Sequence, residues 1–151
     1  MLGNMGEPAV QALSSFLNSS DPVIRWNAAS ALGQTGSEKA VDPLVQALRD
    51  ENGTVRSHAA LALGEIGSRE AVGPLVEAFW DNQRGLASPA ATALGQIGDK
   101  SVTTELESSI DDMENFPYFQ VGQALKKFGS DKAEECFIIG MTSDKYYTRA
   151  A

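Results

Sequence analysis

The chain has 151 residues, of which 42% are hydrophobic, and this is enough to bury the core of one ordinary domain. Its formal net charge of −8 comes from 20 acidic and 12 basic residues with no lysine- or arginine-rich stripe, so neither a nucleic acid nor an anionic membrane surface is an expected partner. The single cysteine, Cys136, excludes an intrachain disulfide and a cysteine-rich metal site and favours a reducing, cytoplasmic compartment, and the sequence shows neither a membrane span nor a signal peptide.

The helices expected along the chain follow a period of 31 residues. Two series of apolar residues and one series of glycines recur at this spacing: Leu32, Leu63, Leu94 and Leu125; Leu13, Leu44, Leu75, Leu106 and Phe137; and Gly36, Gly67, Gly98 and Gly129. A constant period of this length is typical of repeat proteins. It predicts one domain over residues 1–151, made of a partial repeat over 1–19, repeats over about 20–50, 51–81, 82–112 and 113–143, and a partial repeat over 144–151.

The first helix of a repeat is expected over Pro22–Leu32, where apolar side chains recur at helical spacing. The step Gly33–Gly36 should then stop the helix, because glycine readily takes the left-handed conformation that closes one. The side chains expected to be buried on one face of this helix are Ile24, Ala28, Ala31 and Leu32.

The second helix is expected over Glu38–Arg49, with Pro43 either after a bent first turn or early in a helix that starts late. Its expected buried residues are Val41, Leu44, Val45 and Leu48. The short connection makes the two helices of a repeat antiparallel, and so small a pair can bury its apolar face only by stacking on its neighbours. The predicted fold is therefore all-α, an α-solenoid (alpha-alpha superhelix) of about five helical-hairpin repeats.

The later repeats depart from this pattern. In the third full repeat, Ser88 reads as a cap and Pro89 as the first helical residue, so the helix should begin late and be short. In the next repeat, an aromatic cluster with a proline occupies Asn115–Phe119. These irregularities represent either drift in a tolerant scaffold or a shaped binding feature. The acidic stretch Glu105–Glu114 is either a solvated helix face and end or a docking patch for a basic partner.

The motif Asp-Pro-Val-Ile-Arg-x-x-Ala-Ala-x-Ala-Leu-Gly-x-x-Gly-x-x-x-Ala-Val-x-Pro-Leu-Val-x-Ala-Leu at Asp21–Leu48, repeated with variation at Asn52–Phe79, resembles the HEAT-like repeats of phycobilin (PBS) lyases. The resemblance covers essentially the whole chain and weakens after about Gln83. It implies a HEAT-like solenoid. It implies little about function, because such arrays serve many unrelated roles.

The resemblance also implies a role for two recurring charged positions, Arg25, Arg56 and Arg149, and Asp50, Asp81 and Asp112. In the family, such side chains look like a ladder that bonds one repeat to the turns of its neighbours. The alternative is that the arginines form a ligand site.

A candidate binding surface follows from the second helices, which line the concave side of solenoids of this type. Outward positions on these helices vary between repeats while the core positions do not, and variation on a repeated frame suits recognition, although solvated surface also varies freely. Trp80 is the favoured anchor, because exposed tryptophan and arginine are common at interface hot spots, with local packing as the alternative. The candidate partner-binding residues are Gln11, Asp42, Gln46, Arg49, Glu77, Trp80, Thr104, Ser108 and Asp111.

No catalytic, metal or cofactor site is expected. His58 is the only histidine and reads as a surface or repeat-edge residue, Trp26 as convex or packed at the repeat edge, and Cys136 as an ordinary thiol. The predicted function is a non-enzymatic protein-protein interaction scaffold with a protein partner of unknown identity. The alternative is a subunit of a phycobilin-lyase-like or chaperone-like protein-modification complex. The chain begins and ends inside a repeat, which makes self-association through open repeat ends a further possibility.

Overall fold

The computed structural model describes residues 6–81, 85–108 and 118–142, and every regular element in these ranges is helical, as predicted. In chain order the elements are α1 (Gly6–Phe16), α2 (Pro22–Thr35), the 3-10 turn η2 (Glu38–Ala40), α3 (Val41–Ala47), α4 (Gly53–Ile66), the 3-10 turn η3 (Arg69–Ala71), α5 (Val72–Trp80), α6 (Ala87–Ile97), α7 (Lys100–Ser108), α8 (Tyr118–Lys127) and α9 (Lys132–Thr142).

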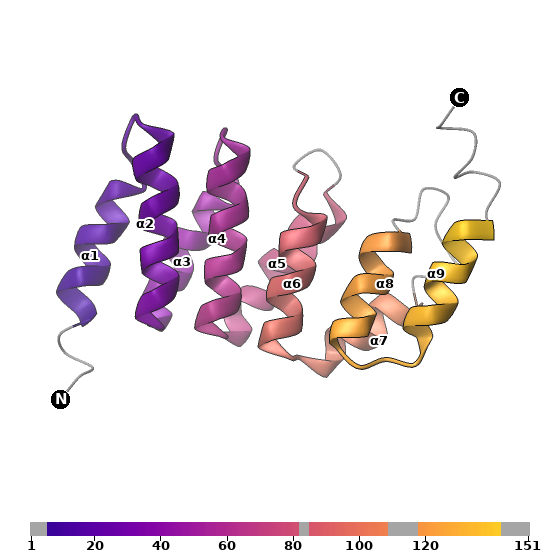
Figure 1. The fold of residues 1–151 in the computed structure, drawn as a ribbon. Coiled ribbons are helices and arrows are strands. Elements are labelled where there is room, and N and C mark those ends of the chain that lie inside the picture. The colour runs from indigo at the N-terminus through magenta and orange to yellow at the C-terminus, as the bar shows by residue number, and fades with distance from the viewer. Residues whose placement is uncertain (1–5, 82–84, 109–117, 143–151) are drawn as a thin grey trace, which may run out of the picture. The chain divides into compact units, whose positions relative to one another are not determined.

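The chain forms two compact units, Met1–Ile97 with α1 to α6 and Gly98–Ala151 with α7 to α9. Within the first unit, α2, α4 and α6 stand side by side in one row, and α3 and α5 lie behind them (Figure 1). This is the stacked-hairpin arrangement that the period of 31 residues predicts. The assignment of residues 1–151 to a single domain, with its repeat boundaries, stays a prediction.

The first helices begin and end as their sequences dictate. Asp21 caps α2 by accepting a hydrogen bond from the backbone N–H of Val23 at 2.8 Å, and Asn52 caps α4 in the same way through Thr54 at 2.9 Å. Both helices end at a glycine in the left-handed conformation, Gly36 in the case of α2 with φ of 64°.

The prediction that α2 stops at Leu32 was wrong, because Gly33 lies inside the helix. Its role is a close approach between helices: a methyl group at Gly33 would lie 2.7 Å from Ala62 Cα on α4. One repeat later, a methyl group at Gly64 would lie 2.6 Å from Ala93 Cα on α6. Neither position can hold a side chain at this spacing, so the two glycines set how closely the first helices stack.

The repeated leucines form the core. Leu32, Leu63, Leu94 and Leu125 are all buried, as predicted, and so are Leu44, Leu75 and Leu106. The predicted burial of Ile24 was wrong: its side chain is 43% exposed, and α2 buries Arg25, Ala28, Ala29, Leu32 and Gly33 instead. Ala31 and Val45 are half-buried.

The second segment of the repeat is divided in two. Residues 38–40 form the 3-10 turn η2, capped by the Ser37 hydroxyl, and α3 begins only at Val41. Pro43 is thus the third residue of α3, where its missing N–H has no intrahelical partner to lose. The expectation of a bent first turn ahead of Pro43 is confirmed.

The third full repeat is irregular in the predicted region. The helix α6 has 11 residues where α2 and α4 have 14, and it begins late, as expected. It begins at Ala87, however, so Pro89 is its third residue and not its first. In the second unit, α8 packs against α9 and buries Leu125 together with Cys136. The cluster at 115–119 lies outside the described residues except for 118 and 119.

Candidate protein-binding surface

The second helices of the first unit expose most of the predicted residues. Asp42 and Gln46, four residues apart on α3, are exposed on one helix face, and Arg49 is exposed just beyond the end of that helix. On α5, Glu77 is exposed. Gln11 on α1 is exposed as well. The surface is therefore polar and of mixed charge.

Trp80, the favoured anchor, is half-buried at the end of α5. Its ring stands edge-on to that of Phe79, with centroids 4.8 Å apart and planes at 83°, and Phe79 is fully buried. Part of the indole thus packs locally while part of it stays accessible. Such a side chain is rigidly held, which suits an interface anchor because little freedom is lost on binding.

Two predicted residues lie in the second unit, and one lies outside the described residues. Thr104 and Ser108 are exposed on α7, four residues apart. Thr104 also lines a groove of about 500 Å³ between α7 and the turn that joins α8 to α9, together with Lys100, Glu107 and Lys132. The period placed Thr104 on the surface, but no sequence signal indicated the groove. Asp111 lies outside the described residues.

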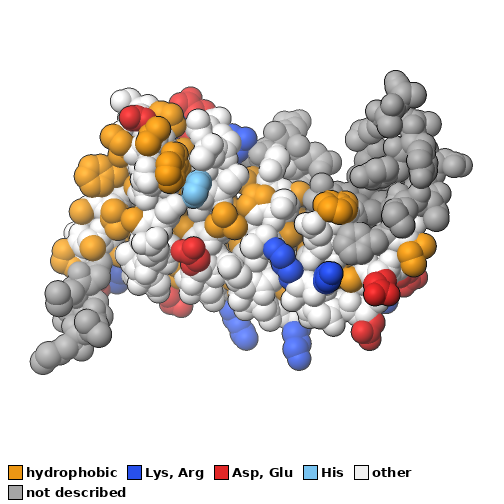
Figure 2. All heavy atoms as spheres, in the orientation of Figure 1, with side chains coloured by type: hydrophobic (Ala, Val, Ile, Leu, Met, Phe, Trp, Pro, Cys, Tyr) orange, Lys and Arg blue, Asp and Glu red, His pale blue; other side chains and the backbone are white. Residues whose placement is uncertain are grey.

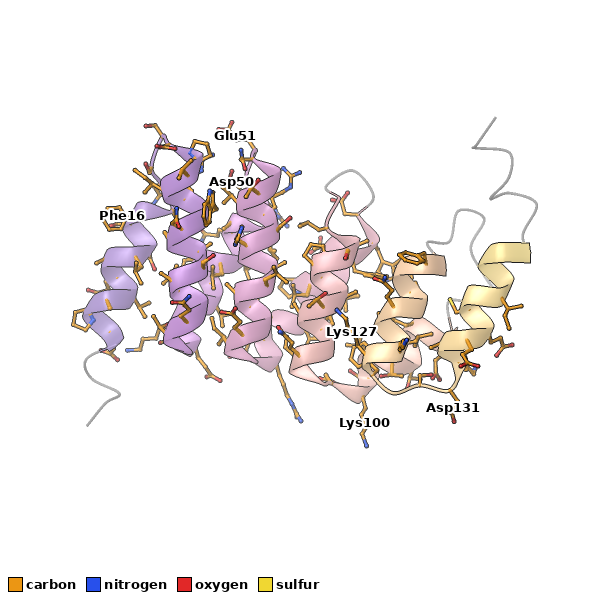
Figure 3. All side chains as sticks on the ribbon, viewed as in Figure 1. Phe16, Asp50, Glu51, Lys100, Lys127 and Asp131 are labelled. Carbon is orange, nitrogen blue, oxygen red and sulfur yellow. The ribbon has the colours of Figure 1, made fainter. Side chains whose placement is uncertain are left out.

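Arg25 and Asp50 form one rung of the predicted ladder. Arg25 is 6% exposed and donates two hydrogen bonds to the Asp50 carboxylate, from Nε at 2.9 Å and from Nη2 at 3.0 Å. Its Nη1 donates to the backbone carbonyls of Ser19 and Ser20 at 2.8 and 3.2 Å. Figure 3 labels Asp50 and Glu51 in the loop that precedes α4. All three guanidinium nitrogens are thus engaged within the protein, which favours the structural role over a ligand site.

The next repeat copies the contacts that Arg25 makes to the loop before its own helix. Arg56 Nη1 donates to the carbonyls of Asp50 and Glu51 at 2.9 and 3.0 Å, as Arg25 does to the preceding loop. Burial acts to raise the pKa of the Asp50 carboxyl, but the hydrogen bonds from Arg25 and the Asn52 backbone, with the nearby positive charges, outweigh it and hold this pKa below its ordinary value. Of the remaining ladder positions, Asp81 is half-buried at the end of α5, and Arg149 and Asp112 lie outside the described residues.

Trp26 and His58 pack between repeats. Their rings stack with centroids 4.8 Å apart and an interplanar angle of 27°, and His58 Nδ1 lies 2.8 Å from the Ser30 hydroxyl. The interpretation of both residues as repeat-edge side chains is confirmed. Figure 2 shows the histidine among apolar and neutral side chains on the first-helix side of the molecule.

The described residues form neither a metal-binding cluster nor an activated thiol. Burial raises the pKa of the Cys136 thiol to about 11, so the thiol is protonated at neutral pH. Within 6–81, 85–108 and 118–142, no three His, Cys, Asp or Glu side chains gather in a way that could hold a metal ion. None of the described helices combines the length and apolar character needed to cross a membrane.

Comparison with known proteins identifies the repeat. The HEAT-repeat family pattern matches residues 1–56 and 41–126. Two solved structures cover most of the chain: the complex of CpcE and CpcF of phycocyanin lyase from Nostoc sp. PCC7120 (26% identity, TM-score 0.67, 91% of this chain) and human deoxyhypusine hydroxylase in complex with glycerol (25% identity, TM-score 0.69, 92% of this chain).

The chain spans 60% of the phycocyanin-lyase chain and 48% of the hydroxylase chain. An engineered protein shares the fold at 20% identity and a TM-score of 0.52, with 91% of this chain and 74% of that chain covered. No protein of curated function matches the chain.

Proposed function

Because this chain belongs to the HEAT-repeat family, we propose that it is a non-enzymatic scaffold that binds a protein partner through the concave face formed by its second helices. The observation that carries the proposal is the contrast along these helices. Leu44 and Leu75 repeat and are buried, whereas Gln46 and Glu77, two positions further on, are exposed and differ. A repeated frame with variable exposed side chains is how solenoids present a recognition surface.

The mixed charge of this face indicates a protein partner with charges of both signs. Arg49 carries the positive charge, and Asp42 and Glu77 carry the negative ones. Charge pairs of this kind set register and specificity more than affinity, while a held aromatic ring such as Trp80 supplies contact area. The net charge of −8 disfavours nucleic acid as the partner. The single cysteine, which is buried, is compatible with a reducing, cytoplasmic compartment.

The test compares the proteins that the wild type and matched variants recover by affinity capture. Glu77→Lys on α5 and Arg49→Ala should each lose a specific partner, whereas Glu65→Lys, an exposed glutamate on the first helix α4, should recover it at the wild-type level. Trp80→Ala is informative once circular dichroism shows it to be folded. If Glu77→Lys and Arg49→Ala recover the same proteins in the same amounts as wild type, the assignment of the binding face is wrong.

A second candidate function rests on the likeness to a chain of the phycocyanin-lyase complex. The chain would then be a subunit of a phycobilin-lyase-like or chaperone-like protein-modification complex. An enzymatic role is compatible with the lyase and hydroxylase neighbours. Incubation with bilin and an acceptor protein discriminates the two: a coloured covalent adduct supports the lyase role, and its absence together with specific partner capture supports the scaffold.

A further inference from the structure

The groove beside α7 lies wholly within the second unit. Its volume is about 500 Å³, and it is bounded by α7 and by residues 128–132, which follow α8. Ligand sites usually have volumes of about 300–1,000 Å³, so the groove is large enough to hold part of a partner molecule. The α7 residues that line it recur at helical spacing on one face: Lys100, Thr103, Thr104 and Glu107.

This groove is polar at positions where the regular repeats are apolar. In α3 and α5, the positions equivalent to Thr103 and Glu107 at the period of 31 residues are all valine. These valines are buried or half-buried: Val41, Val45, Val72 and Val76. A hydroxyl and a carboxylate add nothing to apolar stacking, and polar groups cost free energy when they are buried unpaired. The exchange therefore favours a polar occupant of the groove.

The charges that line the groove are not equally available. Glu107 is half-buried, and its carboxylate accepts a hydrogen bond from the Ser130 hydroxyl. Lys100 and Lys132 are exposed, and neither ammonium group has an ion pair in the part of the chain that the structure describes. Asp131 is exposed on the turn, and Figure 3 shows its side chain and that of Lys100 extending from the same end of the second unit. Two available positive charges against one negative charge favour an anionic occupant.

Two more lysines lie beside the groove. Lys126 and Lys127 end α8 shortly before Phe128, and both are exposed. Charges are screened beyond about 8 Å at physiological ionic strength, so this local excess of lysine outweighs the net charge of −8 for a group bound in the groove. Phe128 also lines the groove and is half-buried, so an apolar contact is available next to the lysines.

We infer that this groove binds an acidic segment of the protein partner, with a carboxylate held by Lys100 and Lys132 and a neighbouring apolar side chain placed against Phe128. Hydrogen bonds between ammonium and carboxylate groups are stronger than those between neutral groups, and the hydroxyls of Thr103 and Thr104 can donate to the same carboxylate. The inference rests on the proposed scaffold function, because it specifies the chemistry of the partner that the scaffold binds.

The test titrates the intact chain, labelled with nitrogen-15, with the end-blocked peptide Glu-Leu-Glu-Glu. We expect its binding to shift the backbone amide signals of Thr103, Thr104 and Gly129, and we expect the peptide Gln-Leu-Gln-Gln to leave them unchanged. Replacing both groove lysines, Lys100→Gln with Lys132→Gln, should weaken binding about tenfold. Glu107→Gln keeps an acceptor for Ser130 and removes a repelling charge, so it should strengthen binding about twofold.

Lys39→Gln is the matched control, because Lys39 lies three periods before Lys132 in a repeat that has valine at the two exchanged positions. It should leave the affinity for the peptide unchanged. Equal binding of the glutamine peptide, or equal affinities of the Lys39 variant and the double lysine variant, would overturn the inference. Tighter binding of an oligothymidylate of the same charge at these amides would overturn it in favour of a nucleic acid.

The groove and the scaffold function can fail independently. If affinity capture loses a specific partner with Arg49→Ala and Glu77→Lys but the acidic peptide does not bind, the scaffold function stands and the groove assignment is wrong. If the peptide binds as expected but those two variants recover every protein at the wild-type level, the groove assignment stands and the proposed binding face is wrong.

Discussion

Substitution of either close-approach glycine by alanine places one methyl group where two helices touch. At Gly64 the new Cβ would lie 2.6 Å from Ala93 Cα and 2.9 Å from Ala93 Cβ, and at Gly33 it would lie 2.7 Å from Ala62 Cα. Ordinary contacts begin at 3.4 Å. The backbone atoms cannot rotate away, so the first helices must separate by about 0.7 Å and loosen the leucine contacts beneath them.

Two opposing terms set the size of the effect. Overpacking of this kind costs about 1–3 kcal/mol. Alanine is a better helix former than glycine by about 1 kcal/mol, which offsets part of that cost. We therefore expect Gly33→Ala and Gly64→Ala each to lower the free energy of unfolding by about 1–2 kcal/mol, measured by urea denaturation followed through helical circular dichroism.

The chain offers a control with the same chemistry and no neighbour. Gly73 lies in α5, and a Cβ there would meet nothing within 4 Å, so Gly73→Ala should leave stability unchanged or raise it by about 0.5–1 kcal/mol. If Gly64→Ala were as stable as Gly73→Ala, the close approach of α4 and α6 at this glycine would be refuted.

Four further outcomes follow from the described contacts. Arg25→Met should lower the melting temperature about threefold more than Lys39→Met, which breaks only the exposed pair with Glu7. Because the folded pKa of Asp50 is lowered from 3.8, its contribution is present above that pH and is lost as the pH falls through the folded value, so Asp50→Asn should flatten acid unfolding followed by circular dichroism. Asn52→Ala should destabilise the protein by about 1 kcal/mol in urea, since it removes the cap of α4. Cys136, buried and with a pKa near 11, should react with iodoacetamide at pH 8 far more slowly in the native protein than in urea.

Each of these four has its own contrary result. Acid unfolding of Asp50→Asn as steep as that of the wild type would mean that the Asp50 carboxylate does not contribute to stability. Equal losses for Arg25→Met and Lys39→Met would mean that the ladder contributes no more than a surface pair. Wild-type stability of Asn52→Ala would mean that the cap is replaced by solvent. Equal alkylation rates for Cys136 in the native and unfolded protein would mean that this thiol is not buried.

The repeat period and the buried leucines were predictable because residues that recur at a constant spacing occupy equivalent positions in successive repeats. Only one stacking geometry then buries every copy. Leu32 and Leu63 follow from that logic alone. Ile24 did not, because its sequence position is equivalent to that of the buried Val55, and its exposure depends on which helix precedes it in space.

The glycines show a second limit of sequence reasoning. Gly33 and Gly36 look alike in the sequence, yet one permits a helix contact and the other ends the helix. Only the packing of α2 on α4 separates these roles. For the candidate surface, seven of the predicted residues are exposed, Asp111 lies outside the described residues, and Trp80 is half-buried because of its contact with Phe79. The groove beside Thr104 arises from elements that share no sequence signal.

The arginine ladder has a consequence for how such a chain can change length. Loops between repeats are usually where insertions are accepted. Here Arg25 joins the loop before its own helix to the loop that ends its repeat, and the distance in sequence from Arg25 to Asp50 is 25 residues. An added residue between Leu48 and Asn52 would displace the carboxylate from the guanidinium, so growth by single residues is penalised there. Duplication of a whole period keeps every rung, and an array held in this way lengthens most readily in complete steps.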